Sequence, residues 1–287
     1  MKYRQRRVVS GRGSETGSFA KALRGLAVDE DDRLYTVGDS AVQVFDPDGA
    51  FVRRWATERP GYSVEVDGDG DVWVGEAGQV ESFDRSGERR QRWRDDERFG
   101  LVTAIGFAGD GVLLADARAR CIRHYGRDGT FHNNIGDRHR KGGFHIPNGV
   151  VDFAVDAGGV VHVANPGMHR VERYTPAGEL RGWFGRFDGL DPEGFPGCCN
   201  PTNVAVTDSG RVLVTEKAGP RAKVYDRDGN LLAVVAAADS FDPAAKNMDL
   251  AVDSRGRIYV ADTVRLQVCI FEPVAEAVVA AAEEAGT

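Results

Sequence analysis

The sequence predicts an all-β protein built from six repeated sheets, and three observations predict it. A segment of the type A-V-D-x-x-G-x-V-x-V-x-D occurs six times, ending at Asp39, Glu76, Asp116, Asn165, Glu216 and Asp262. Each copy is followed by an alternating segment such as QVFDPDG or KVYDRDG. The 36 glycines are spread through the 287 residues as turn punctuation. Copies that recur every 40–50 residues or so match one four-stranded blade each, so we expect a six-bladed β-propeller of antiparallel blades.

Each repeat unit predicts four strands in a fixed order. The apolar run before D-x-x-G is the inner strand, D-x-x-G is a hairpin turn, and a segment such as IYV is the second strand. The alternating Q-V-x-x-F/Y segment is the third strand, D-x-D-G is the next turn, and runs such as FVRRW or LLAVVA are the outer strand. Two-residue periodicity with turns at short intervals leaves little room for helix.

The two ends of the chain predict how the ring closes. The last unit ends at Glu272-Pro273 without an outer strand, and the chain begins with an unpartnered β-like stretch at residues 4–10. We expect this stretch to complete the sixth blade, because closure removes the exposed edges of an open sheet. Residues 1–273 then form a single domain, and residues 274–287 form a short helix or a disordered tail.

Composition and charge exclude several classes of protein. The formal net charge of −7 provides no basic field for nucleic acid. No run approaches the ~18 apolar residues of a membrane helix, and no apolar run follows the basic residues at the amino terminus. Four cysteines are too few for a disulfide scaffold of this size. We therefore expect a soluble, cytoplasmic protein with neither a nucleic-acid nor a membrane partner.

Two motifs carry a family resemblance. V-D-x-x-G-x-I-Y-V-A-D at residues 252–262 and H-R-V-x-x-Y at residues 169–174 resemble NHL repeats, and residues from about 4 to 273 resemble a six-bladed NHL-type propeller. The chain more distantly resembles gluconolactonase-like and amidating-lyase-like propellers. The resemblance implies the fold. Such propellers include scaffolds, lyases, lactonase-like hydrolases and ligand receptors, so function has to be argued from the places where the repeats differ.

The repeats differ most in blades four to six. Their inner strands are entered by long loops, residues 138–151, 187–202 and 239–248, and loops of this length are usually functional or disordered. The residue that opens each inner strand differs in the same half of the ring. It is small in the first three blades and carries a side-chain oxygen in the last three: Gly25, Ser63, Ala104, Asp152, Asn203 and Asp249.

These oxygen-bearing side chains predict a site at the channel mouth. Asp152, Asn203 and Asp249 could converge near the axis as hard ligands for Ca²⁺ or Mg²⁺, with Asp152 or Asp249 as ligand or general base. The alternative interpretation is that Asp and Asn here cap loop turns through their own backbone.

A second candidate site contains the adjacent pair Cys198 and Cys199. Adjacent cysteines can form a strained vicinal disulfide, bind a soft metal as thiolates, or be buried and inert. Together with His145 and His169 they have the ligand types of a zinc or copper site. His169 falls within the repeat motif, which favours a structural role for it.

Several further residues are candidates for holding a ligand. Lys217, Arg221 and Lys246 lie in loops expected to open on the mouth, where they could hold a carboxylate or another small anion. Pro147-Asn148-Gly149 resembles the P-N-G turn of gluconolactonase-like propellers, which implies that Asn148 lies next to a divalent metal. Asn200 and Glu216 are further candidates for ligand binding.

Three functions remain open at this point. The first is a small-molecule site, expected to take an anion, with hydrolase or lyase chemistry assisted by a divalent ion (Ca²⁺, Mg²⁺ or Zn²⁺). The second is a non-catalytic NHL scaffold that binds a protein partner across one face. The third is a soft-metal or redox site at Cys198 and Cys199. The sequence does not decide whether the protein is an enzyme.

Overall fold

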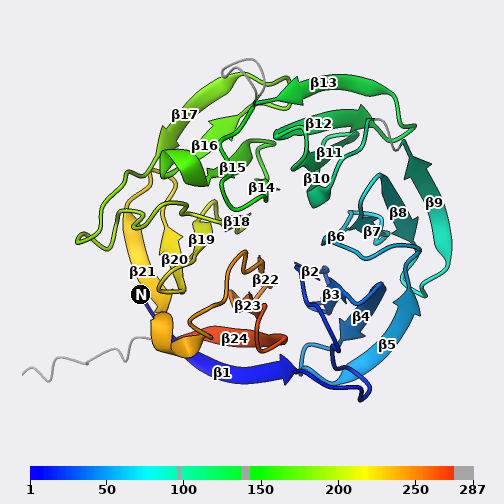
Figure 1. The fold of residues 1–287 in the computed structure, drawn as a ribbon, viewed down its shortest axis with the longest axis horizontal. Helices are drawn as coiled ribbons and strands as arrows, with labels where there is room; N and C mark the ends of the chain where they lie inside the picture. Colours follow the sequence, from blue (N-terminus) through cyan, green and yellow to red (C-terminus); the bar gives the residue numbers. More distant parts are fainter. Residues whose placement is uncertain (96–97, 137–142, 275–287) are drawn as a thin grey trace, which may run out of the picture.

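The computed structural model describes residues 1–95, 98–136 and 143–274, and it confirms the predicted six-bladed β-propeller. Six four-stranded antiparallel sheets stand around a central axis, with the first strand of each repeat unit innermost (Figure 1). Within these residues, helix is limited to two single turns, η1 (Pro166–Met168) and η2 (Ala238–Ser240). No helix of the described chain is long and apolar enough to span a bilayer. The expected tail, residues 275–287, lies outside the described residues.

The strands follow the repeat units from the axis outward. The first blade contains β2 (Gly25–Val28), β3 (Leu34–Gly38), β4 (Ala41–Phe45) and β5 (Phe51–Ala56). The second contains β6 (Ser63–Val66), β7 (Val72–Gly75), β8 (Gln79–Phe83) and β9 (Arg89–Arg94). The third contains β10 (Val102–Ala108), β11 (Gly111–Asp116), β12 (Cys121–Gly126) and β13 (Phe131–Ile135).

The second half of the ring repeats this pattern. The fourth blade contains β14 (Asp152–Val155), β15 (Val161–Asn165), β16 (Arg170–Tyr174) and β17 (Leu180–Phe184). The fifth contains β18 (Asn203–Val206), β19 (Val212–Glu216), β20 (Arg221–Tyr225) and β21 (Leu231–Ala236). The sixth contains β22 (Leu250–Val252), β23 (Ile258–Asp262), β24 (Gln267–Val274) and the first strand of the chain, β1 (Lys2–Ser10).

The ring closes as the sequence predicts. Strand β1 pairs antiparallel with β24, from Lys2 opposite Val274 to Ser10 opposite Gln267 (Figure 1). The sixth blade therefore combines the two ends of the described chain, and its rim strand has a partner along its whole length. Because β1 begins at Lys2, the closing strand is longer than the stretch at residues 4–10 that the sequence indicates.

The aspartate of the D-x-x-G motif explains why the repeat is so regular. In the sixth blade, Asp253 accepts hydrogen bonds from the backbone N–H groups of Arg255 and Arg257, and from the Tyr259 hydroxyl at 3.0 Å. The side chain thus fixes its own turn and ties it to the second strand. Three other blades use the same arrangement, with the pairs Asp29 and Tyr35, Asp67 and Trp73, and Asp156 and His162.

The hydrophobic core consists of six layers, each between two neighbouring blades. Val37 and Val64 belong to the layer between the first and second blades, and Leu213 and Phe271 to the layer between the fifth and sixth. This packing fixes the distance of each inner strand from the axis. The side chains that open these strands are therefore held on a rigid ring.

Candidate functional site

Two cavities lie along the channel of the propeller. The mouth cavity, about 380 Å³, is lined by the loops that enter the inner strands, with Lys21, Arg24, Tyr62, Asn148 and Lys246 among its residues. The axial cavity, about 350 Å³, is lined by the inner strands themselves. Thr103 and Asp249 line both cavities, so they stand where the two meet.

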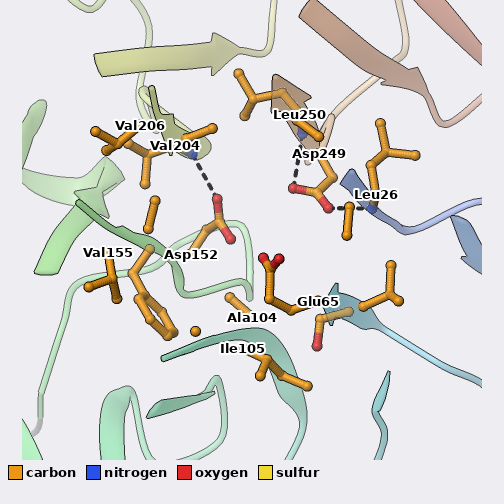
Figure 2. Close-up of a pocket in the computed structure, with 18 of the residues that line it drawn as sticks. Leu26, Glu65, Ala104, Ile105, Asp152, Val155, Val204, Val206, Asp249 and Leu250 are labelled. Carbon is orange, nitrogen blue, oxygen red and sulfur yellow. Dashed lines mark hydrogen bonds between the residues drawn. The ribbon is translucent and has the colours of Figure 1, made fainter. Parts of the chain in front are cut away.

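Three carboxyl groups point toward one another in the axial cavity (Figure 2). Asp152 opens β14, Asp249 directly precedes β22, and Glu65 lies in β6 on the other side of the channel. Among the described residues, none of the three carboxylates forms an ion pair with a Lys, Arg or His side chain. The axis of this propeller therefore holds a concentration of acidic groups without a protein counter-charge.

Each aspartate also joins two neighbouring blades. Asp152 Oδ2 accepts a hydrogen bond from the Val204 N–H at 2.7 Å, which ties the fourth blade to the fifth. Asp249 Oδ2 accepts one from the Leu26 N–H at 2.7 Å, which ties the sixth blade to the first, and its Oδ1 accepts one from Leu250 at 3.0 Å (Figure 2). The alternative interpretation, in which these side chains satisfy backbone groups, is thus partly supported, because both carboxylates accept hydrogen bonds from backbone N–H groups.

Burial shifts the pKa values of all three carboxyl groups upward. Burial raises the pKa of Glu65 to about 8, with a smaller contribution from the charge of Asp249. Burial raises the pKa of Asp249 to about 7, and burial together with the charge of Asp249 holds the pKa of Asp152 well above its ordinary value. Strongly shifted carboxyl groups in a cavity are a common mark of a functional site.

Asn203 completes the set that the sequence predicts. It opens β18 and is 4% exposed, and its side chain partly offsets the upward pKa shifts of Asp152 and Asp249. Its Oδ1 has no hydrogen-bond partner in the described chain, although it is buried. An orphaned buried oxygen beside two carboxylates suits a bound cation, since such atoms are normally satisfied. The structure thus brings Asp152, Asn203 and Asp249 together.

Glu65 is a site residue that the sequence analysis missed. It occupies the third position of its inner strand, two residues after Ser63. In the other five blades that position is a small residue: Ala27, Gly106, Ala154, Ala205 and Ala251. A glutamate where the five equivalent positions carry small residues is a signal that the aligned repeats contain.

The mouth cavity contains basic side chains, in addition to Asp249 where it meets the axial cavity. Lys21, Arg24 and Lys246 line it, and within the described residues none of these three forms an ion pair. The Arg24 guanidinium lies over the Tyr62 ring, 4.0 Å from its centroid. On the other side, Asn148 Nδ2 donates to Asn247 Oδ1 at 2.8 Å, and Asn148 Oδ1 is buried without a partner in the described chain. Of the predicted ligand-binding residues, Asn148 and Lys246 line this cavity.

The other predicted ligand-binding and catalytic residues lie outside both cavities. Glu216 is fully buried and forms ion pairs with Arg221 at 2.5 Å and with Lys223 at 2.6 Å, as part of the core of the fifth blade. Asn200 has a structural role, because its side chain joins two loop segments. Its Nδ2 donates a hydrogen bond to the Pro196 carbonyl, and its Oδ1 accepts one from the Lys217 N–H at 2.8 Å. Neither cavity has any of these residues in its lining.

The soft-ion set is not assembled into one cluster. His145 is exposed, and the His169 ring stacks edge-on against Phe187 with 5.1 Å between centroids. Cys198 and Cys199 lie together, with 2.7 Å between their Sγ atoms. Across the described ranges, no three His, Cys, Asp or Glu side chains are grouped as ligands for one ion. Within the described residues, the same absence of a metal-holding group applies to the axial carboxylates of Glu65, Asp152 and Asp249.

No protein-family model matches this chain, and no curated protein matches its sequence. Solved structures do resemble it. A protein of unknown function from Bacteroides thetaiotaomicron is 15% identical at a TM-score of 0.71, over 94% of this chain and 75% of that one. A virginiamycin B lyase from Staphylococcus aureus is 10% identical at a TM-score of 0.61, over 95% and 100%. A streptogramin B lyase is 10% identical at 0.58, over 87% and 93%. Identity this low shows the fold alone.

Proposed function

We propose that this propeller binds a small anionic molecule in the mouth cavity and acts on it as a hydrolase or lyase with the help of a divalent cation. Asp152, Asn203 and Asp249 are the residues that would hold the cation. The observation that carries the proposal is the uncompensated oxygen cluster at the axis: the buried carboxylate of Asp152 and the half-buried carboxylate of Asp249 beside the orphaned Oδ1 of Asn203.

The chemistry of the three ligands favours a hard cation. Carboxylate and amide oxygens are the ligands of Ca²⁺ and Mg²⁺, whereas zinc sites use His and Cys. When bound, such an ion polarises a carbonyl group of the substrate or lowers the pKa of a water molecule. Its positive charge would also compensate the buried carboxylates, which explains how they can be kept at the axis.

The protein's own residues would bind and orient the substrate. Lys21, Arg24 and Lys246 would hold its anionic group, and the Arg24 guanidinium is already fixed against Tyr62. Glu65 faces the aspartates from the opposite side of the channel, and burial raises its pKa to about 8 (Figure 2). It would hold a proton near neutral pH, which suits a general acid. Two solved structures of similar fold are lyases, which supports an enzymatic function for a propeller of this kind but no role for a particular residue.

A cation titration tests the proposal directly. We expect purified protein to contain a stoichiometric divalent ion, and the metal-free protein to gain thermal stability with Ca²⁺ or Mg²⁺, by about 2.7 kcal/mol at one hundred times Kd. Asp249→Asn should abolish this gain while keeping an oxygen for the Leu26 N–H. Asp228→Asn, an exposed change in the fifth blade, is the control. Protein without stoichiometric metal that also shows no gain with Ca²⁺, Mg²⁺ or Zn²⁺ would refute the proposal.

One observation favours the alternative of a protein-binding scaffold. Trp183, Phe187 and Leu190, on β17 and in the loop after it, are 54%, 63% and 98% exposed. Exposed apolar side chains close together in the chain are typical of interaction surfaces. A scaffold needs no ion at its axis, so the same titration separates the two functions.

A further inference from the structure

Cys198 and Cys199 lie in a segment that the structure holds firmly. The segment belongs to the long loop between β17 and β18, and the Asn200 side chain ties it to Pro196 within the loop and to Lys217 beyond β19. Asn200 Nδ2 donates to the carbonyls of Pro196 at 2.7 Å and of Lys217 at 3.0 Å, while its Oδ1 accepts from the Lys217 N–H. The two cysteines and Lys217 are therefore kept together by one buried amide.

The two thiols differ in solvent exposure and in the direction of their pKa shifts, as a reactive pair requires. Cys198 is exposed and Cys199 is 3% exposed, and their Sγ atoms are 2.7 Å apart. The hydrogen bond from Cys199 lowers the pKa of Cys198, and the charge of Lys217 lowers it further. Burial raises the pKa of Cys199, and the nearby Lys217 side chain partly offsets this rise. The accessible sulfur is thus the more readily ionised one, and thiolates are the reactive form of cysteine.

We propose that Cys198 and Cys199 form a reversible dithiol–disulfide pair that is oxidised by hydrogen peroxide. The Cys198 thiolate attacks one oxygen of the peroxide, the O–O bond breaks, and the released hydroxide takes up a proton to leave as water. Cys198 is then a sulfenic acid. The Cys199 thiol attacks its sulfur, the S–S bond forms, and the S–O bond breaks with loss of a second water. Two thiols are oxidised, and one peroxide is reduced to two waters.

The pair should be easy to reduce again. Adjacent Cα atoms are about 3.8 Å apart across a trans peptide, shorter than the 4.4–6.8 Å or so that a relaxed disulfide spans. The ring formed by neighbouring cysteines is therefore strained, and strained disulfides have higher reduction potentials than structural ones. We therefore expect a disulfide between Cys198 and Cys199 to form and break reversibly in response to the redox conditions. The inference is independent of the cation site, because neither sulfur lines the mouth or axial cavity.

Thiol counting with mass spectrometry tests the proposal. Native protein is treated with one equivalent of hydrogen peroxide, denatured, and titrated for thiols. The chain has four cysteines, so we expect four thiols before treatment and two after it, with the loss of two hydrogen atoms from the peptide that contains residues 198 and 199. Dithiothreitol should restore all four. The double variant Cys121→Ala/Cys269→Ala removes the other two cysteines and should still lose two thiols.

Cys198→Ser and Cys199→Ser test the assignment within the pair. In Cys199→Ser we expect Cys198 to stop at the sulfenic acid or overoxidise, because no resolving thiol remains. In Cys198→Ser we expect Cys199 to stay reduced, since it is buried. Four thiols remaining in the treated native protein, or a disulfide that links two chains instead of residues 198 and 199, would overturn the proposal.

Discussion

Replacing Glu65 by glutamine should change how the stability of the metal-free protein depends on pH. Burial raises the pKa of this carboxyl from 4.5 to about 8. Between these two values the folded protein keeps a proton that the unfolded chain releases. The contribution of the Glu65 carboxyl to the free energy of unfolding is therefore fully present below pH ~4.5 and is lost as the pH rises to ~8. At about 1.36 kcal/mol per pKa unit, the upper bound is about 5 kcal/mol, of which about 3.5 kcal/mol is lost between pH ~5 and ~8.

Urea denaturation in EDTA at several pH values between 5 and 8 measures this effect. We expect wild-type stability to fall with pH more steeply than that of Glu65→Gln, because the neutral amide removes the titrating group. The variant should equal the wild type near pH 5 and exceed it by up to about 3.5 kcal/mol near pH 8. Glu88→Gln, an exposed change in the same blade, should leave the wild-type slope unchanged. If the free energy of unfolding depends on pH in the same way for the wild type and for Glu65→Gln, the raised pKa of Glu65 is refuted.

Three further predictions concern the axis, the mouth and the core. Asp152→Asn keeps an oxygen for the Val204 N–H and removes a buried charge, so it should raise the melting temperature of the metal-free protein at pH 8 and abolish its gain with cations. Arg24→Ala and Lys246→Ala should each weaken binding of a small probe anion such as citrate, about tenfold or more by calorimetry, because charged hydrogen bonds contribute about 1.5–3 kcal/mol. Lys223→Met should destabilise the fold by about 3–5 kcal/mol in urea, since it leaves the Glu216 carboxylate buried without this partner.

The repeat made most of the fold predictable, including ring closure by the first strand. It also placed Asp152, Asn203 and Asp249 together, because equivalent positions on equivalent strands surround one axis. The positions of Glu216 and Arg221 could not be found in the same way. Both stand where a second strand turns into a third, and their sequence positions do not reveal whether a side chain points to the channel or into its own blade. In the structure they pair within the fifth blade.

Of the three basic residues of the mouth, the sequence predicts Lys246 but not Lys21 and Arg24. Long loops indicate a site in the fourth to sixth blades, whereas Lys21 and Arg24 lie in the short loop that enters the first blade. A ring brings the sixth blade against the first, so a short loop can face a long one across the mouth. Ring closure and the direction of the side chains decide which loops line the same cavity. Loop length reveals neither of them.

Two pairs of neighbouring blades are joined at the axis without a charged side chain. Ser63 Oγ donates to the Val102 carbonyl at 3.1 Å, and Thr103 Oγ1 donates to the Val151 carbonyl at 2.6 Å. A hydroxyl therefore suffices to tie neighbouring inner strands in the second and third blades. Where Asp152 and Asp249 perform the same task, their negative charges add a desolvation cost that the joint itself does not require. The proposed cation would compensate this cost.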